Sequence, residues 1–327
     1  MASVQGTTDT GNTGDTGDTG TDVVTGAFGY SGGAIAAALL GAGREVRTLT
    51  GHPDRAPAGS PVAAHPLDFD DRAGLVAALT GATTLYNTYW VRFARGGTDH
   101  ALAVARSRIL FEAACEAGVR RVVHVSITHP DAESPFPYFR GKAQVERELA
   151  ATGLSHAIVR PAILFGGDGV LVNNIAWLLR RLPVFGIGGR GDYRVRGIHV
   201  DDLARLCVGY GAERANTVVD AVGPERPTFL ELVEAVRDAV GSRSRIVRVP
   251  GAAVPVLGWG LGLALRDVLL TRDEYLAMAA GLADSDAPST GTTAISDWIA
   301  AEGADLGQHY AHELRRHFDS KGTVKRA

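Results

Sequence analysis

From residue 22 to residue 166, short apolar runs alternate with helical stretches, and this alternation restricts the possible folds more than any other feature. The runs DVVT, EVRTLT, HPLDF, TLYNTYW, RRVVHVSIT and SHAIVRPAILFG predict six strands. Between them, SGGAIAAALLGAG, HALAVARSRILFEAACEAG and KAQVERELAATG predict helices. Strand–helix alternation with right-handed crossovers gives a parallel sheet that is covered on both faces. The sequence therefore predicts an α/β fold with a doubly wound parallel sheet, whose ligands bind at the carboxyl ends of the strands.

The pattern also divides the chain. Residues 1–21 repeat glycine at every third position from 11 to 20 and are otherwise polar, so we expect a disordered tail. Residues 22–165 form the expected dinucleotide-binding domain. Beyond 166 the alternation loosens, which predicts a smaller substrate lobe over 166–327, with 196–222 returning to the sheet.

The composition limits the kinds of partner that we expect for this chain. The 327 residues carry a net charge of −3, which gives no indication of nucleic acid as a partner. The two cysteines lie far apart in apolar patterns, so we expect no disulfide framework, no metal site and a reducing cytoplasmic location. The uncharged stretch 251–265 is too short to span a bilayer. We interpret it as a lobe-packing or interface segment, with contact to a membrane surface as the weaker alternative.

A glycine-rich loop follows the first strand directly. Gly26, Gly29 and Gly32 form a GxxGxxG pattern that also holds Phe28 and Tyr30, between the first strand and the first helix. Glycines there let the backbone approach a pyrophosphate, whose charge is favoured by the N–H groups at the helix start. The alternative is a tight turn with close helix–sheet packing. The position of the loop favours dinucleotide binding.

The tip of the second strand normally separates NAD from NADP. No acid stands directly at this tip, and Arg47, His52 and Arg55 are the nearby basic groups. This weakly favours NADP, with NAD as the alternative, although each basic group could be a solvated loop charge. Asp68 is a candidate partner for the adenine, and Asn87 for the ribose.

Three residues form a candidate proton-transfer set. Ser126 follows the fifth strand, and Tyr138 and Lys142 stand four apart, on one face of a helix. Tyrosine has an unperturbed pKa near 10, and a neighbouring ammonium would favour the phenolate. Gly141 is costly inside a helix, which indicates a close approach by some other group. In the alternative reading Tyr138 only packs on the first turn, and Lys142 pairs with Glu146.

The ordered motifs TGAFGYSG, VHVS, YFRGK, RPAILFG and HVDDLA resemble the extended or atypical branch of the short-chain dehydrogenase/reductase superfamily, which includes proteins similar to NAD-dependent epimerases and dehydratases. LYNTYWVRF, NNIAWLLRRLPVFG and DVLLTRDEYLAMAAGL are more narrowly similar to the group of the nucleotide-binding accessory subunit of respiratory complex I. The resemblance implies a Rossmann domain that binds NAD(P). It implies Ser126, Tyr138 and Lys142 as catalytic residues, and places Lys142 and Pro161 beside the cofactor. Arg160 and Pro161 match the RP element after the sixth strand, and His199, Asp201 and Asp202 match the HVDD element. Pro161 and the three residues of the HVDD element are expected to act as hinges between the two lobes.

The chain departs from this pattern twice. Where relatives often carry an asparagine in the helix after the fourth strand, this chain has Arg106-Ser107-Arg108. Where atypical relatives have arginine at the second-strand tip, it has Gly51.

From the motifs that match, we expect an NAD(P)-dependent oxidoreductase that acts on a carbonyl or alcohol of a small molecule. A non-catalytic NADPH-binding sensor or structural subunit and a nucleotide-sugar epimerase or dehydratase are the alternatives. The sequence leaves the substrate and the oligomeric state open.

Overall fold

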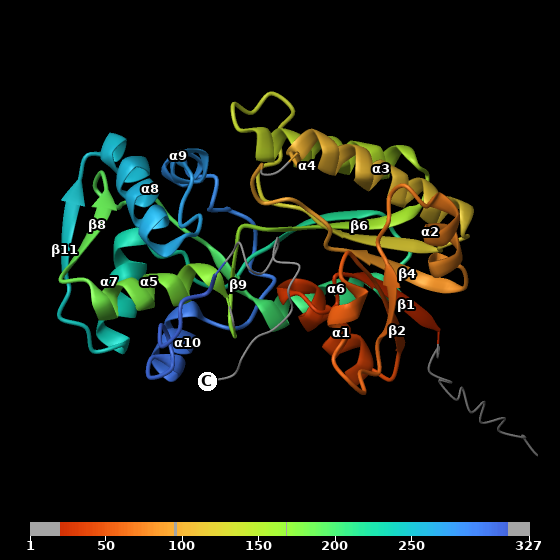
Figure 1. Ribbon diagram of the computed structural model, residues 1–327, viewed down its shortest axis with the longest axis horizontal. Helices are drawn as coiled ribbons and strands as arrows, with labels where there is room; N and C mark the ends of the chain where they lie inside the picture. Colours follow the sequence, from red (N-terminus) through yellow and green to blue (C-terminus); the bar gives the residue numbers. More distant parts are fainter. Residues whose placement is uncertain (1–19, 95–96, 168, 313–327) are drawn as a thin grey trace, which may run out of the picture.

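The computed structural model describes residues 20–94, 97–167 and 169–312. Its seven-stranded sheet has the order β10-β6-β5-β4-β1-β2-β3, and every neighbouring pair is parallel (Figure 1). The strands of this sheet are β1 (Thr21–Thr25), β2 (Glu45–Thr50), β3 (Ala63–Pro66), β4 (Ala82–Asn87), β5 (Arg121–Val125), β6 (Ser155–Pro161) and β10 (Thr217–Ala221). The predicted α/β class and doubly wound parallel sheet are confirmed.

Helices cover both faces of the sheet, as a parallel sheet requires. One face carries α2 (Arg72–Leu79), α3 (His100–Glu116) and α4 (Pro137–Ala151), and the other carries α1 (Tyr30–Gly41) and α6 (Val200–Ala212) (Figure 1). The central strands β1 and β5 are buried along their whole length. Because both faces are covered, their sequences do not alternate between buried and exposed positions, and the polar side chains of Asp22, Arg121 and His124 are buried beside the valines.

The predicted sixth strand is in fact two strands. Pro161 ends β6, since a proline has no N–H to continue the ladder. After a bend at Ala162, β7 (Ile163–Phe165) pairs instead with β9 (Gly197–His199) in a separate small sheet. β10 then returns beside β6, where the sequence placed 196–222.

The remaining elements form a second lobe around a core of its own, which includes Phe165, Leu179, Ile187 and Phe229. Its elements are α5 (Val170–Arg181), β8 (Val184–Gly188), α7 (Phe229–Ala239), β11 (Arg245–Val249), α8 (Val254–Leu265), α9 (Arg272–Ala279) and α10 (Ile295–Glu302), together with the short 3-10 helix η2 (Gly251–Ala253). β8 and β11 pair as a parallel two-stranded ribbon at the end of the molecule farthest from α2 (Figure 1).

Two expectations about the chain ends and the apolar stretch can be compared with this arrangement. Thr21, which we assigned to the tail, is the buried first residue of β1, because its backbone pairs with both β2 and β4. Of the other residues of the predicted tail, Gly20 is described and 1–19 lie outside the described residues. Within the described ranges, no helix has both the length and the apolar character to cross a bilayer.

Candidate functional site

The glycine loop lies at the carboxyl end of β1 and leads straight into α1. Gly26 has a φ of +68°, which favours glycine. A Cβ on Gly32 would lie 2.3 Å from the Gly26 carbonyl oxygen, so only glycine allows the helix to begin this close to the strand. No side chain of the described residues caps the start of α1 at Gly29. The first N–H groups of the helix are therefore available to an anion.

The residues around this loop are fixed in different ways. Phe28 packs against the core between α1 and α6. The Tyr30 hydroxyl donates to the Gly166 carbonyl oxygen at 2.7 Å, which ties the start of α1 to the turn after β7. Pro161 is buried at the end of β6, and its carbonyl accepts from the Thr128 amide at 3.1 Å.

The basic residues predicted near the second-strand tip separate into two groups. His52 and Arg55 follow the carboxyl end of β2, around the short 3-10 helix η1 (Pro53–Arg55). Their side chains have no hydrogen bond or ion pair among the described residues. Arg47 instead donates to the Thr80 carbonyl oxygen at 3.0 Å, just before β4 begins. Because strands β1 to β4 are parallel, this places the Arg47 guanidinium at the amino edge of the sheet, away from the glycine loop.

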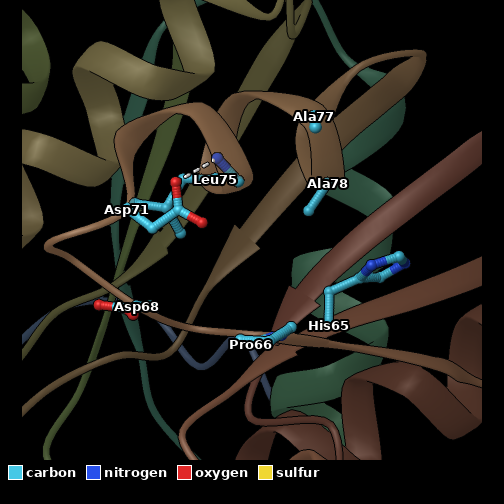
Figure 2. A pocket seen from close by; sticks show the side chains of 8 residues that line it. His65, Pro66, Asp68, Asp71, Leu75, Ala77 and Ala78 are labelled. Carbon is cyan, nitrogen blue, oxygen red and sulfur yellow. Dashed lines mark hydrogen bonds between the residues drawn. The ribbon is translucent and has the colours of Figure 1, made fainter.

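Asp68 follows β3 at the outer edge of the sheet. It is exposed and lines a cavity of about 290 Å³ between β3 and α2, together with His65, Pro66 and Asp71 (Figure 2). Asp71 caps α2 by accepting from the Gly74 amide at 2.9 Å, which is the bond drawn in Figure 2. The structure thus places Asp68 at the correct edge for a cofactor, two strands from the loop.

Asn87 faces inward and not toward the cofactor edge. Its side-chain oxygen accepts from the Thr25 hydroxyl at 3.2 Å and from the Tyr89 amide at 3.0 Å, and its amide nitrogen lies 3.1 Å from His124 Nδ1. Asn87 is fully buried, so these bonds join β1, β4 and β5. This placement gives Asn87 a structural position, because both of its polar atoms are already engaged.

Ser126 lies beyond the end of β5, as expected, but its hydroxyl is also engaged. It donates to Glu146 Oε1 at 2.5 Å, and the same carboxylate accepts two bonds from the Arg160 guanidinium. Ser126 and Glu146 are buried, whereas Arg160 is partly exposed. The three side chains join the ends of β5 and β6 to α4.

Tyr138 and Lys142 share one face of α4, and the Trp90 indole contacts both. The Lys142 Nζ lies 4.7 Å from the centre of the Trp90 ring and donates to the Val125 carbonyl oxygen at 2.9 Å. The Tyr138 ring meets the Trp90 ring edge-on, with centroids 5.7 Å apart, and Trp90 is itself stacked on His100. Trp90 comes from the loop after β4, so this loop closes over the first two turns of α4.

The Trp90 contact also explains Gly141. A Cβ on Gly141 would lie 2.8 Å from Trp90 Cη2 and 3.5 Å from the His100 Cβ. The close approach inferred from the sequence is therefore made by an aromatic side chain of the protein. The Trp90 indole N–H is buried and has no partner in the described part of the chain.

Burial dominates the electrostatics of the pair. It raises the pKa of Tyr138 well above its usual value; the Arg92 guanidinium opposes this shift, and Glu274 adds to it. Burial lowers the pKa of Lys142 to about 7, and Glu146 offsets part of that shift. Arg92 and Glu274 form an ion pair at 2.7 Å between the loop after β4 and α9. The second lobe thus reaches the Tyr138 side of the site.

Sequence reasoning missed Trp90, His100, Arg92 and Glu274, which surround Tyr138. Of these four, only Trp90 lies in the aromatic run LYNTYW, which the strand pattern absorbed. His124 was missed as well: it is buried beside Asn87, and burial together with Lys142 lowers its pKa, so the ring is neutral. No cluster of possible metal ligands occurs among the described residues.

Comparison with known proteins gives the class of ligand. Residues 26–176 match a family model described as NAD(P)H-binding. This part of the chain is an NAD(P)H-binding domain. The match begins at the first glycine of the loop and includes Ser126, Tyr138 and Lys142, so the expected cofactor class is confirmed.

Similarity to whole proteins extends past this domain. An uncharacterised protein of Mycobacterium tuberculosis is 31% identical over 261 residues, which cover 77% of this chain and 27% of that protein. The NAD(P)H-binding chain therefore spans about a quarter of the length of this relative. The mitochondrial NADH-ubiquinone oxidoreductase 40 kDa subunit of Neurospora crassa is 27% identical, over 50% of this chain and 43% of that subunit.

Solved structures support the fold. The triphenylmethane reductase of Citrobacter sp. superposes with a TM-score of 0.71 over 88% of this chain and 100% of that one, at 18% identity. The neighbours as a group are NAD(P)-dependent reductases and nucleotide-sugar epimerases. The predicted resemblance to short-chain dehydrogenases/reductases is confirmed at the level of the cofactor-binding domain and its fold.

Proposed function

We propose that the protein is an NAD(P)-dependent oxidoreductase that reduces a carbonyl, or an equivalent electrophilic group, of a small organic molecule. The observation that carries this proposal is the placement of Tyr138 and Lys142 on one face of α4. Both lie in the matched NAD(P)H-binding domain and at the carboxyl edge of the same sheet as the glycine loop. Ligands of parallel sheets bind along this edge.

Several residues fit the cofactor. Gly26, Gly29 and Gly32, with the uncapped start of α1, would hold the pyrophosphate. His52 and Arg55 would bind a 2′-phosphate, which favours NADP over NAD, and Asp68 would approach the adenine. Phe28, Tyr30 and Pro161 would line the site. Arg47 and Asn87 are left out, because their polar atoms are bonded elsewhere.

The nicotinamide would supply hydride when bound. The chain itself would supply the proton: since burial raises the pKa of Tyr138, its phenol is protonated near neutral pH. A protonated phenol can donate to a carbonyl oxygen, which suits the reducing direction. The Arg92 guanidinium, which already opposes the rise in the pKa of Tyr138, would stabilise the phenolate left behind, together with Lys142 in its ammonium form. Ser126 would contact the substrate only after releasing Glu146.

The proposal is tested by turnover. Purified protein is screened with NADPH and NADH against quinones, ketones and aldehydes, beside Tyr138→Phe and Lys142→Ala. Tyr138→Phe is expected to lower kcat by at least about 100-fold while NADPH still binds. Tyr193→Phe is the matched control, since Tyr193 is packed against Phe229 in the second lobe and should keep full activity. A Tyr138→Phe variant with the wild-type rate refutes the proposal.

One observation favours a second function, that of a non-catalytic NADPH-binding subunit or sensor. The Trp90 indole contacts both Tyr138 and Lys142 and fills the space between them and His100. If this is the permanent position of Trp90, the cofactor binds without a substrate. In that case NADPH binds to wild-type protein and to Trp90→Ala, but neither protein turns over any compound in the screen.

The structure gives less support to a nucleotide-sugar epimerase or dehydratase. Such a site needs free cations for the diphosphate. Five arginines of the second lobe that could serve this purpose are engaged: Arg180, Arg181, Arg194 and Arg196 all donate to backbone carbonyl oxygens, and Arg190 pairs with Asp192.

A further inference from the structure

Helix α8 exposes several of its large apolar side chains and buries two of its three glycines, Gly258 and Gly262. Val256, Trp259 and Leu263 lie on one face and are 66%, 68% and 60% exposed. On the buried side, a Cβ on Gly262 would lie 2.6 Å from the Asp267 carbonyl oxygen, and one on Gly258 3.2 Å from that of Leu270. An ordinary surface helix has the opposite distribution. We call the surface of Val256, Trp259 and Leu263 the α8 face.

Further exposed apolar side chains continue this face. Val184 on β8, Val247 on β11 and Leu276 on α9 are each at least 37% exposed, and these elements are neighbours of α8 (Figure 1). Val247 stands opposite Gly186 in the ribbon, and Gly186 lies next to Leu257 of α8. The exposed apolar residues thus gather at one end of the molecule, which distinguishes them from the singly scattered ones of a normal surface.

The segment that forms β11 and α8 carries charge of one sign. Residues 240–266 contain Arg243, Arg245, Arg248 and Arg266 and no acidic residue, although the whole chain has a net charge of −3. All four are exposed, and none of their guanidinium groups has a hydrogen bond or ion pair among the described residues. Arg245 stands opposite Val184 in the ribbon and two residues before Val247, so it shares their side, whereas Arg248, directly after Val247, points to the other side of the ribbon. Arg266 ends α8 with a φ of +54°, where glycine is favoured.

We propose that the α8 face, with Arg243, Arg245 and Arg266, is a docking surface for an anionic lipid bilayer. Apolar and aromatic side chains enter the boundary between headgroups and acyl chains, and arginines around them attract anionic headgroups. A second copy of this chain is a poorer occupant. A twofold interface would bring the same three arginines together, with no acid in 240–266 to balance them.

Vesicle sedimentation tests the proposal with the full chain. We compare vesicles of phosphatidylcholine alone with vesicles that also contain about one-third phosphatidylglycerol. Binding is expected only to the anionic vesicles, and it should fall as ionic strength rises from about 0.1 M to about 1 M. Tryptophan emission should shift to the blue on binding, because Trp259 is highly exposed in the free protein.

Variants separate the two parts of the surface. Trp259→Ser and Leu263→Ser are each expected to weaken binding at least about tenfold, and Arg245→Glu and Arg266→Glu at least about fivefold. Val218→Ser on β10 removes an apolar side chain that is 51% exposed elsewhere, and Arg108→Glu reverses a charge on α3; both should bind like wild type. NADPH affinity is measured on every variant to establish that it is folded.

Three results would overturn the proposal: no sedimentation of wild-type protein with anionic vesicles at low salt, equal binding to neutral and anionic vesicles, or unchanged binding of Trp259→Ser. A dimer in analytical ultracentrifugation that Leu263→Ser dissociates, together with no vesicle binding, would assign the α8 face to a second copy of the chain.

Discussion

The contact between Gly141 and Trp90 gives a prediction whose size follows from the structure. In an open helix, replacing glycine by alanine stabilises the protein by about 1 kcal/mol. At Gly141 the new Cβ would lie 2.8 Å from Trp90 Cη2 and 3.2 Å from Cζ2, which real Cβ atoms do not tolerate. Overpacking of this kind costs about 1–3 kcal/mol. Gly141→Ala should therefore change the free energy of unfolding by between about zero and a loss of about 2 kcal/mol.

A double-mutant cycle isolates the contact. In a Trp90→Ala background the obstacle is absent, so Gly141→Ala should stabilise by the full value of about 1 kcal/mol. The coupling between the two sites is then about 1–3 kcal/mol. Urea unfolding followed by far-ultraviolet circular dichroism measures all four proteins without depending on tryptophan emission. Gly209→Ala is the matched control: Gly209 lies inside α6 with open space around its Cβ position, and alanine should stabilise there by about 1 kcal/mol.

The reasoning fails if Gly141→Ala stabilises the wild-type protein as much as it stabilises Trp90→Ala. A coupling below about 0.5 kcal/mol would mean that Trp90 does not rest on α4 in solution. The space between Tyr138 and Lys142 would then be open to a ligand without any movement of the indole.

Three further predictions concern the loop, the lysine and the buried carboxylate. Gly32→Ala should weaken NADPH binding more than tenfold in calorimetric titration, because displacing the loop would cost about 1.4 kcal/mol or more. Gly33→Ala is the control: its Cβ would lie 3.3 Å from the nearest atom, so its affinity for NADPH should stay within a few-fold of wild type. Because burial lowers the pKa of Lys142 to about 7, the unfolded chain binds more protons than the folded chain between pH 7 and the usual pKa of lysine. In this range the free energy of unfolding in urea should therefore rise by up to about 1.4 kcal/mol per pH unit, and Lys142→Met should remove this rise. The same slope in Lys142→Met and wild type would contradict the burial of a lysine that titrates. Glu146→Gln should cost about 1–3 kcal/mol in the same assay, because it removes the charge that pairs with Arg160 and turns one of the two acceptor oxygens into a donor. Glu148→Gln, on the same helix, should cost less than about 0.5 kcal/mol.

The sheet was predictable because its signal is local. Short runs rich in β-branched residues indicate strands, and the first, second, fourth and fifth such runs overlap β1, β2, β4 and β5. The glycine loop was predictable for a similar reason, since Gly26 and Gly32 are required by the backbone itself. The division of the sixth run into β6 and β7 was not, because β7 forms only by pairing with β9, more than thirty residues later.

The surroundings of Tyr138 were not predictable, because they depend on side-chain direction in a loop. Nothing in TYW distinguishes an indole that packs on α4 from one that faces solvent; that direction is set by the gap at Gly141 and by stacking on His100. Hydropathy likewise cannot tell which side of an all-apolar helix is covered, so the exposed face of α8 was not visible in residues 251–265.

The state of Lys142 follows from what Glu146 does four residues further along α4. Spacing alone allowed these two residues to form an ion pair. In the structure the Glu146 carboxylate instead accepts from Ser126 and Arg160, and it only partly offsets the effect of burial on Lys142. The lysine is left with a backbone carbonyl and the face of Trp90 as its contacts, and for this reason its pKa falls to about 7. A change at Arg160 that frees Glu146 should thus raise the pKa of Lys142, although Arg160 does not touch the lysine.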